Sequence, residues 1–145
     1  MFKLLLLLLV LVSACVAIHG LGMMVGLRWL HLNRPDHGHH HFSILQGFRI
    51  LVSVVFGLLL LHLVQILVWA ICYHWGGCFP DFLTSFYYSA TSYSTVGYGD
   101  VSPPGNWRLL GSIEAVTGIL MFGWSTGVLF SVVTFVQARY TGHHG

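Results

Sequence analysis

The residues with types and spacing suited to chemistry lie in one short run, Thr95-Val96-Gly97-Tyr98-Gly99. Glycines alternate here with residues that carry side chains, a pattern that fits neither a helix nor a half-buried strand. Because glycine reaches left-handed φ values without steric cost, such a run can turn successive carbonyl oxygens the same way. Aligned carbonyls, with the Thr95 hydroxyl at the inner end, could replace the hydration shell of a cation. The run therefore predicts a row of cation ligands. The sequence contains no group of residues spaced as in a catalytic site, so an enzyme is not expected.

The run resembles the selectivity filter of the potassium channel superfamily, of which T-V-G-Y-G is the standard example. The resemblance covers about residues 43–136 and is most specific over residues 94–100. It implies a small prokaryotic-type pore domain with two transmembrane helices, which conducts potassium ions passively and selectively. One chain supplies a quarter of each carbonyl ring, so the resemblance also implies a homotetramer. The implied ion-binding residues are Thr95, Val96, Gly97, Tyr98 and Gly99.

The resemblance gives supporting roles to residues around this run. An aromatic residue of the preceding helix, Tyr87 or Tyr88, would donate a hydrogen bond to Asp100. Ser94 keeps the hydroxyl of the threonine that more usually precedes the filter. Thr91 stands where some members carry a buried glutamate behind the filter. A role of that carboxylate in inactivation therefore cannot be carried over to this chain.

The composition is typical of a membrane protein. Of the 145 residues, 56% are apolar and only 7% are charged, whereas soluble domains carry about 25% charged residues. Mean hydropathy is +0.79, and the apolar stretches reach the length of about 20 residues that a spanning helix needs. The predicted fold is all-α, with three transmembrane helices, a re-entrant pore helix and the filter, assembled as a tetramer. The net charge of +2 is too small for a nucleic-acid surface, so the expected partners are lipid and three further copies of the chain.

The chain divides into four predicted segments: an N-terminal transmembrane helix over residues 1–30, a cytoplasmic histidine-rich linker over 31–47, a pore domain over 48–137 and a short tail over 138–145. Within the pore domain we expect an outer helix at 48–73, the pore helix at 81–94, the filter at 95–100 and an inner helix at 109–137. The pore helix is too short to span the bilayer. Such backbone is tolerated at membrane depth only when it is buried in protein or lines a wet cavity.

The first apolar stretch allows a second interpretation. Lys3 followed by a leucine run is typical of a signal peptide, and residues 12–15 loosely resemble a lipoprotein cleavage site. The apolar character continues well past Cys15, which favours a retained helix with the pore domain behind it. His19 within that helix is an ionisable group at membrane depth and hence a functional candidate, although hydrogen-bonded packing is the simpler interpretation.

The linker carries a cluster of histidines, namely His37, His39, His40 and His41. Clustered imidazoles can bind zinc, nickel or copper, or titrate near neutral pH. Asp36 is the one other ligand at tight spacing, so the sequence supports a structural zinc site only weakly. A solvated loop is the simpler interpretation.

The second apolar stretch carries His62 and Gln65, three residues apart on one helical face. Polar pairs at membrane depth usually bond to a neighbouring helix, which favours packing over the alternative of proton sensing by His62. Cys72 and Cys78 flank a short aromatic loop, where either a disulfide or two free thiols is compatible with an outer, oxidising side.

The third apolar stretch is by resemblance the pore-lining inner helix. Gly118 falls within a residue of the glycine at which inner helices of the family bend, and it is the candidate gating hinge. Leu120, Gly123 and Gly127 are expected near the water-filled cavity. Glu114 is the acid of this helix, and it either pairs with Arg108 or with hydroxyls behind the pore helix, or it faces the cavity.

The basic residues predict the orientation. If the filter loop lies outside, the linker and tail place four arginines in the cytoplasm, against Lys3 and Arg108 outside, in agreement with the positive-inside tendency. The N-terminus is then outside and the C-terminus cytoplasmic, in a plasma or inner membrane. No helix carries an arginine at every third position, so a voltage sensor is not supported.

Other functions remain open at this point. A non-selective cation channel would share the fold, and a histidine-rich metal-binding membrane protein would use the 37–41 cluster instead. A secondary potassium transporter would carry four degenerate filter loops in one chain, and this chain has one intact copy. No cofactor is expected beyond the permeant potassium ions.

Overall fold

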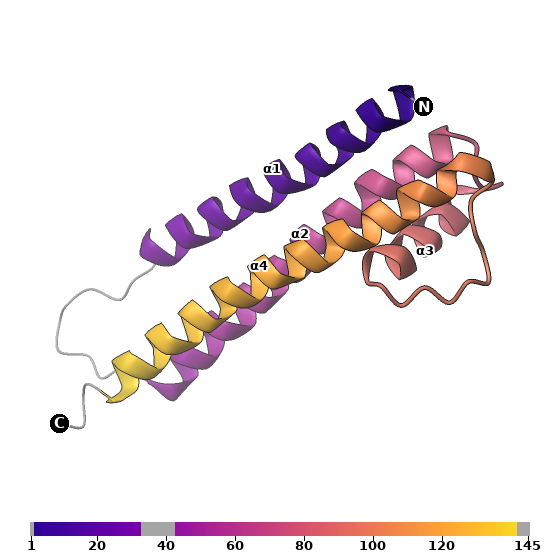
Figure 1. Ribbon diagram of the computed structural model, residues 1–145. Helices are drawn as coiled ribbons and strands as arrows, with labels where there is room; N and C mark the ends of the chain where they lie inside the picture. The colour runs from indigo at the N-terminus through magenta and orange to yellow at the C-terminus, as the bar shows by residue number, and fades with distance from the viewer. Residues whose placement is uncertain (1, 33–42, 142–145) are drawn as a thin grey trace.

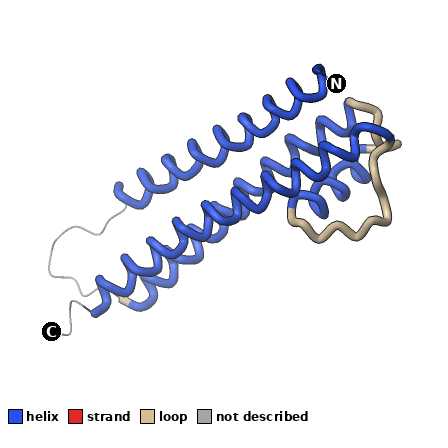
Figure 2. Tube along the Cα trace, viewed as in Figure 1, coloured by secondary structure: helices blue, strands red, loops and turns tan. Residues whose placement is uncertain are grey.

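The computed structural model describes residues 2–32 and 43–141. These form α1 (Phe2–Leu32), α2 (Ile44–Trp75), α3 (Phe82–Tyr93), a short 3-10 turn at Gly105–Trp107 and α4 (Arg108–Thr141). No strand occurs within these two ranges (Figure 2). The predicted all-α fold is therefore confirmed. The histidine cluster at residues 37–41 lies outside the described residues.

Three of the helices contain stretches long and apolar enough to cross a membrane. These stretches are Phe2–Trp29, Ile44–Trp75 and Gly105–Tyr140. Their outward surfaces carry large exposed apolar side chains, such as Leu9, Phe56 and Phe130. A surface of that kind is stable against lipid tails and costly in water. These stretches indicate a multi-pass membrane protein, in which α1 precedes the predicted pore domain.

The long helices lie side by side (Figure 1). The N-terminus and α3 lie at the same end of the bundle and the C-terminus at the opposite end, so the direction of the chain alternates from α1 to α2 to α4. The short helix α3 packs against both α2 and α4, and α1 also packs against α2 and α4. The N-terminal helix is therefore part of the same bundle as the predicted pore domain.

The helix boundaries follow from their capping residues. Ser43 begins α2 through a capping box, in which its hydroxyl accepts from the first turn while Gln46 reaches back to the Ser43 N–H, 3.1 Å away. Because this cap stabilises a helix that begins with polar residues, α2 begins at Ile44 and not at the predicted residue 48. Asp81 begins α3, since its carboxylate accepts from the Thr84 N–H at 2.8 Å. The inner helix also continues past residue 137, to Thr141.

The core lies where α2, α3 and α4 meet. Trp69, Tyr73, Tyr93 and Leu110 are fully buried there, and side chains from the first half of α1 join the same cluster. At the end of the bundle that holds α3, the Trp107 indole lies against Gly76, where a Cβ would collide with the ring. This contact holds the end of α2 close to the start of α4, the two helices against which α3 packs.

Candidate functional site

The loop of residues 94–100, which we call the signature loop, continues directly from α3. Its backbone is left-handed at every second residue, with φ of 63° at Thr95, 53° at Gly97 and 75° at Gly99. Thr95 is the one non-glycine residue with positive φ in the described ranges, and such a conformation persists only when its surroundings hold it. The alternation is the arrangement that the glycine spacing predicts, and it is the backbone form that can align successive carbonyls.

Hydrogen bonds to α3 hold the beginning of the signature loop. The Thr95 N–H donates to the Ser92 carbonyl at 2.9 Å, and the Gly97 N–H donates to the Thr91 carbonyl at 3.0 Å. Beyond these bonds the loop lies on the surface, where Val96 is 53% and Tyr98 71% exposed. One chain therefore presents the loop without enclosing a path for an ion.

The end of the signature loop also returns to α3. The Tyr87 hydroxyl donates to Asp100 Oδ2 at 2.8 Å, so Tyr87 is the one of the two candidate tyrosines that makes this bond. Donation to the carboxylate is the main cause that raises the pKa of Tyr87. Tyr88 lies elsewhere, edge-on to Tyr73 with ring centroids 5.1 Å apart and with its hydroxyl against Gly111. The loop is thus fastened to α3 at both ends.

The other two predicted supporting residues bond within α3. The Ser94 hydroxyl donates to the Ala90 carbonyl at 2.7 Å, and the Thr91 hydroxyl donates to the Tyr88 carbonyl at 3.0 Å. Both hydroxyls therefore stabilise the last turns of the helix. Their contribution to the signature loop comes from the position of that helix end.

Glu114 is fully buried behind α3. The Tyr73 hydroxyl of α2 donates to its Oε2 at 2.8 Å, and the Ser89 hydroxyl of α3 lies 2.5 Å from its Oε1. Ser89 also reaches the Ile66 carbonyl of α2 at 2.9 Å. Among the three predicted environments of Glu114, the structure therefore shows the hydroxyls behind α3. This cluster joins α2, α3 and α4 at one point.

A second buried polar cluster lies at the C-terminal end of α3. His62 and Gln65 of α2 both meet the Tyr93 hydroxyl, at 3.1 and 2.8 Å, and each also bonds to another helix. Gln65 Nε2 lies 2.8 Å from His19 Nδ1 of α1, and His62 Nε2 lies 3.0 Å from the Ser125 hydroxyl of α4. The shared face of His62 and Gln65 indicated bonds between helices. No sequence pattern distinguished Ser125 from the other hydroxyl residues of this apolar helix.

Gly118 of α4 packs against the last turn of α3. A Cβ at Gly118 would overlap the carbonyl oxygen of Tyr93, so the absence of a side chain is what allows this approach. Helix α4 is continuous through this position. A hinge at Gly118 stays a prediction. Within a single chain, Gly118 allows α4 to pack closely against the end of α3.

The three cavity candidates lie away from the buried interface of the chain. Leu120 is 61% exposed, and no side chain or backbone atom would meet a Cβ at Gly123 or Gly127 within 4 Å. They are thus free to face a cavity or a neighbouring copy. Their placement at a cavity stays a prediction.

The cysteines near the loop between α2 and α3 are two separate thiols. Cys72 and Cys78 are both free, and burial raises the pKa of the Cys78 thiol. Of the two alternatives, the chain by itself therefore shows the unbonded one. Over residues 2–32 and 43–141, His, Cys, Asp and Glu do not form a cluster of three suited to a metal ion.

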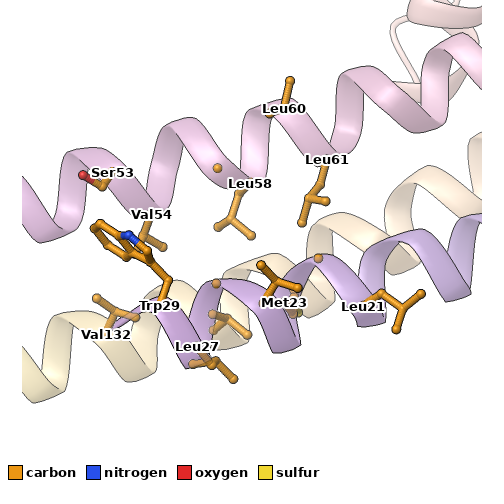
Figure 3. A pocket seen from close by; sticks show the side chains of 15 residues that line it. Leu21, Met23, Leu27, Trp29, Ser53, Val54, Leu58, Leu60, Leu61 and Val132 are labelled. Atoms are coloured by element: carbon orange, nitrogen blue, oxygen red, sulfur yellow. The ribbon is translucent and has the colours of Figure 1, made fainter. Parts of the chain in front are cut away.

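An apolar pocket lies between α1, α2 and α4, nearer the cytoplasmic end of the predicted orientation. Its volume is about 540 Å³, and Figure 3 shows Met23 of α1 and Leu58 and Leu61 of α2 pointing toward one another across it. Gly22 allows a close approach of α1 to α2, since a Cβ there would overlap the Leu61 side chain. With so few polar groups, this pocket cannot coordinate an ion, and the signature loop remains the candidate site.

Comparison with known proteins identifies the family. A family model described as "Ion channel" matches residues 49–135, which run from the start of α2 through α3 and the signature loop to the last turns of α4. No curated protein and no solved structure matches the chain. The match covers more than half of the chain and leaves α1 outside. The chain therefore belongs to the ion channel family with a potassium-channel-like pore domain of two transmembrane helices, to which it adds the N-terminal helix α1.

Proposed function

We propose that the chain is the subunit of a potassium-selective channel, in which the signature loop supplies the ion ligands. The observation that carries this proposal is the left-handed backbone at Thr95, Gly97 and Gly99. Alternation of this kind turns neighbouring carbonyl oxygens to one side, where they can replace the water around a dehydrated potassium ion. The ion then crosses down its electrochemical gradient, and no cofactor or bond chemistry takes part.

We propose a homotetramer as the conducting form. A single signature loop supplies one carbonyl at each level, whereas a potassium ion needs oxygen ligands on all sides. The exposure of Val96 and Tyr98 is consistent with a loop that is completed by neighbours. A closed ring of four identical chains provides that arrangement with one repeated interface.

The proposed orientation places the signature loop at the outer face of a plasma or inner membrane. The N-terminus lies at the same end of the bundle as α3, so it is outside as well, and the C-terminus is cytoplasmic (Figure 1). Arg139 is then on the inner side, in keeping with the positive-inside tendency. The pore helix α3 directs its C-terminal end, the negative end of its dipole, toward Thr95, which favours a cation there.

The test is ion flux through the purified protein in liposomes, with sodium in place of potassium and with barium as a blocker. We compare the wild type with Gly97→Ala, because a Cβ disfavours the left-handed φ of 53° at this position. Gly57→Ala is the matched control, since it makes the same change inside a helix where a Cβ meets nothing within 4 Å. We expect potassium flux that barium blocks, that Gly97→Ala abolishes and that Gly57→Ala leaves intact.

Three results would contradict the proposal. Equal sodium and potassium flux would indicate a non-selective cation channel. Assembled protein without flux that binds zinc or nickel stoichiometrically would favour the metal-binding alternative, with the histidines at 37–41 as its ligands. Flux that survives Gly97→Ala unchanged would place the ion path away from the signature loop.

A further inference from the structure

Five buried side chains from α1, α2, α3 and α4 form a closed ring of hydrogen bonds. In order they are His19, Gln65, Tyr93, His62 and Ser125, which bonds back to His19 at 3.1 Å. His19, Gln65 and Tyr93 are 0% exposed, and His62 and Ser125 are 7% exposed. We call this set the polar ring. Each of the long helices contributes to it, and α3 contributes its last residue.

The hydrogen atoms of the polar ring all point the same way around. Tyr93 donates its single hydrogen to Gln65 Oε1, so its oxygen must accept from the His62 Nδ1–H. The other nitrogen of His62, Nε2, then accepts from the Ser125 hydroxyl. The Ser125 oxygen accepts in turn from the His19 Nε2–H, which leaves His19 Nδ1 to accept from the Gln65 amide.

This arrangement satisfies each of these buried groups with two neutral imidazoles. Five hydrogens serve five bonds, so no donor faces another donor. Bonds that run in one direction around a ring polarise one another and strengthen the set. Removal of one member therefore leaves one buried polar atom on each of its two neighbours unbonded, which costs more than the bond itself.

The ring acts at the junction between α3 and the signature loop. Tyr93 lies two residues before Thr95, the residue whose left-handed backbone begins the loop. Beside the ring, Gly118 of α4 packs against the Tyr93 carbonyl. The imidazoles are enclosed by aromatic rings of α4, since His62 lies 4.4 Å from Phe122 and His19 lies 5.4 Å from Trp124 between centroids. The position of Tyr93 is thus fixed from both its side chain and its backbone.

We propose that His19 of α1 is a positioning residue for ion selectivity, which acts through the polar ring on Tyr93 and so on the start of the signature loop. The N-terminal helix α1 then contributes to ion selectivity, although the family match does not include it. The inference rests on the proposed potassium-channel function. It assigns His19, Gln65, His62 and Ser125 one shared task, which is to hold the C-terminal end of α3 in place.

The experiment measures the ratio of potassium to sodium flux in liposomes for assembled, size-selected protein. This ratio is a property of each open pore, so a loss of folded molecules does not change it. His19→Leu and Ser125→Ala each break the ring. His19→Gln keeps one donor and one acceptor at position 19, so it can restore the hydrogen bonds of the ring. Ser131→Ala is the matched control for Ser125→Ala, because the Ser131 hydroxyl bonds to the Gly127 carbonyl of its own helix at 3.0 Å.

We expect the ratio to fall about tenfold for His19→Leu and for Ser125→Ala. The reason is that one or two unpaired buried groups would displace Tyr93 and so change the geometry of the signature loop. We expect His19→Gln to recover most of the wild-type ratio and Ser131→Ala to match it. An unchanged ratio in His19→Leu would overturn the inference. Equal losses in His19→Leu and His19→Gln would also overturn it, since hydrogen bonding would then not be the cause.

A second measurement separates this inference from the proposed function. If the wild type shows no potassium-selective flux, the proposed function fails. The ring is then tested by a double-mutant cycle on thermal unfolding, with His19→Leu, Tyr93→Phe and the double variant. Effects that do not add would support the coupling of α1 to α3 through the ring, because both changes break the same network. Strictly additive effects would overturn it.

Discussion

The two sides of α3 differ in whether contacts within one chain bury the side chains that lie there. On the side away from the signature loop, Ser89 and Tyr93 are fully buried and bond to groups of α2 and α4. On the other side, Val96 and Tyr98 of the signature loop are exposed. The support of the loop is therefore finished within each chain, whereas the proposed ion path exists only where several chains meet.

This difference separates the groups that stabilise each chain from the groups that other copies would cover. Changes behind α3 remove packing or leave buried polar groups unpaired, so they should lower the stability of each chain. Changes in the signature loop touch a surface that other copies would cover, so they should alter conduction while the chain still folds.

The largest effect is expected for Gly118→Ala. A Cβ at this position would overlap the Tyr93 carbonyl oxygen, and a backbone atom cannot move aside as a flexible side chain does. Helix α4 must then separate from α3, at a cost of about 3 kcal/mol. Thermal unfolding in detergent measures the loss, with Gly123→Ala as the control because a Cβ there meets nothing within 4 Å. Equal unfolding temperatures for the two variants would contradict the proposed contact.

A smaller loss is expected for Glu114→Leu. It leaves the buried Tyr73 hydroxyl without its partner and removes one of the two acceptors of the Ser89 hydroxyl, which keeps the Ile66 carbonyl, and it should cost about 2 kcal/mol. Glu114→Gln offers an acceptor and a donor at the same place and should lose less than half of that. The measurement is again thermal unfolding, combined with the tetramer fraction by size exclusion. If leucine and glutamine are equally stable, the hydroxyl cluster does not stabilise the fold.

On the loop side, Tyr87→Phe should reduce potassium flux severalfold while the unfolding temperature stays close to the wild-type value. The change removes the bond to Asp100 and nothing from the buried side. Because the folded-state pKa of Tyr87 is raised above its ordinary value of 10.0, this bond is fully present below pH 10 and is lost as the pH rises through the raised pKa. A large fall in unfolding temperature would contradict the separation of the two sides.

The smallest effect concerns the cap of α3. Hydrogen bonds from Thr84 lower the pKa of Asp81 below its ordinary value of 3.8. The cap therefore contributes stability above that value, and the contribution is lost as the pH falls below it through the folded-state pKa. Asp81→Ala should lower the unfolding temperature slightly at neutral pH and by less near pH 3. An equal difference at both pH values would show that the carboxylate charge is not what caps the helix.

The sequence predicted the helices well because their signal is local. Long apolar runs and the short segment before the loop, which carries Tyr87 and Tyr88, predicted the long helices and α3 in the right order. The boundaries of α2 and α4 were less certain, since polar residues at a helix end, such as Gln46, are compatible with either helix or linker. The glycine spacing in the signature loop indicated its alternating backbone, because only glycine adopts that conformation freely.

The supporting contacts were predictable only as sets of candidates. Tyr87 and Tyr88 are adjacent in sequence, yet they point to different sides of α3, one to Asp100 and the other to Gly111. For Glu114, both an arginine and hydroxyl groups were plausible partners, and burial behind α3 selected the hydroxyls. A rotation of about 100° per residue along a helix changes which neighbour a side chain meets.

An all-helical membrane chain of the ion channel family can be recognised in the amino-acid sequence, because length, hydropathy and a contiguous motif are properties of neighbouring residues. The contacts of His19 with Gln65 and Ser125, which lie 46 and 106 positions further along the chain, became visible in the folded chain. Such partners depend on the depth and rotation of each helix in the bundle. Those quantities are set by packing among all the helices and are encoded in no single stretch of the chain.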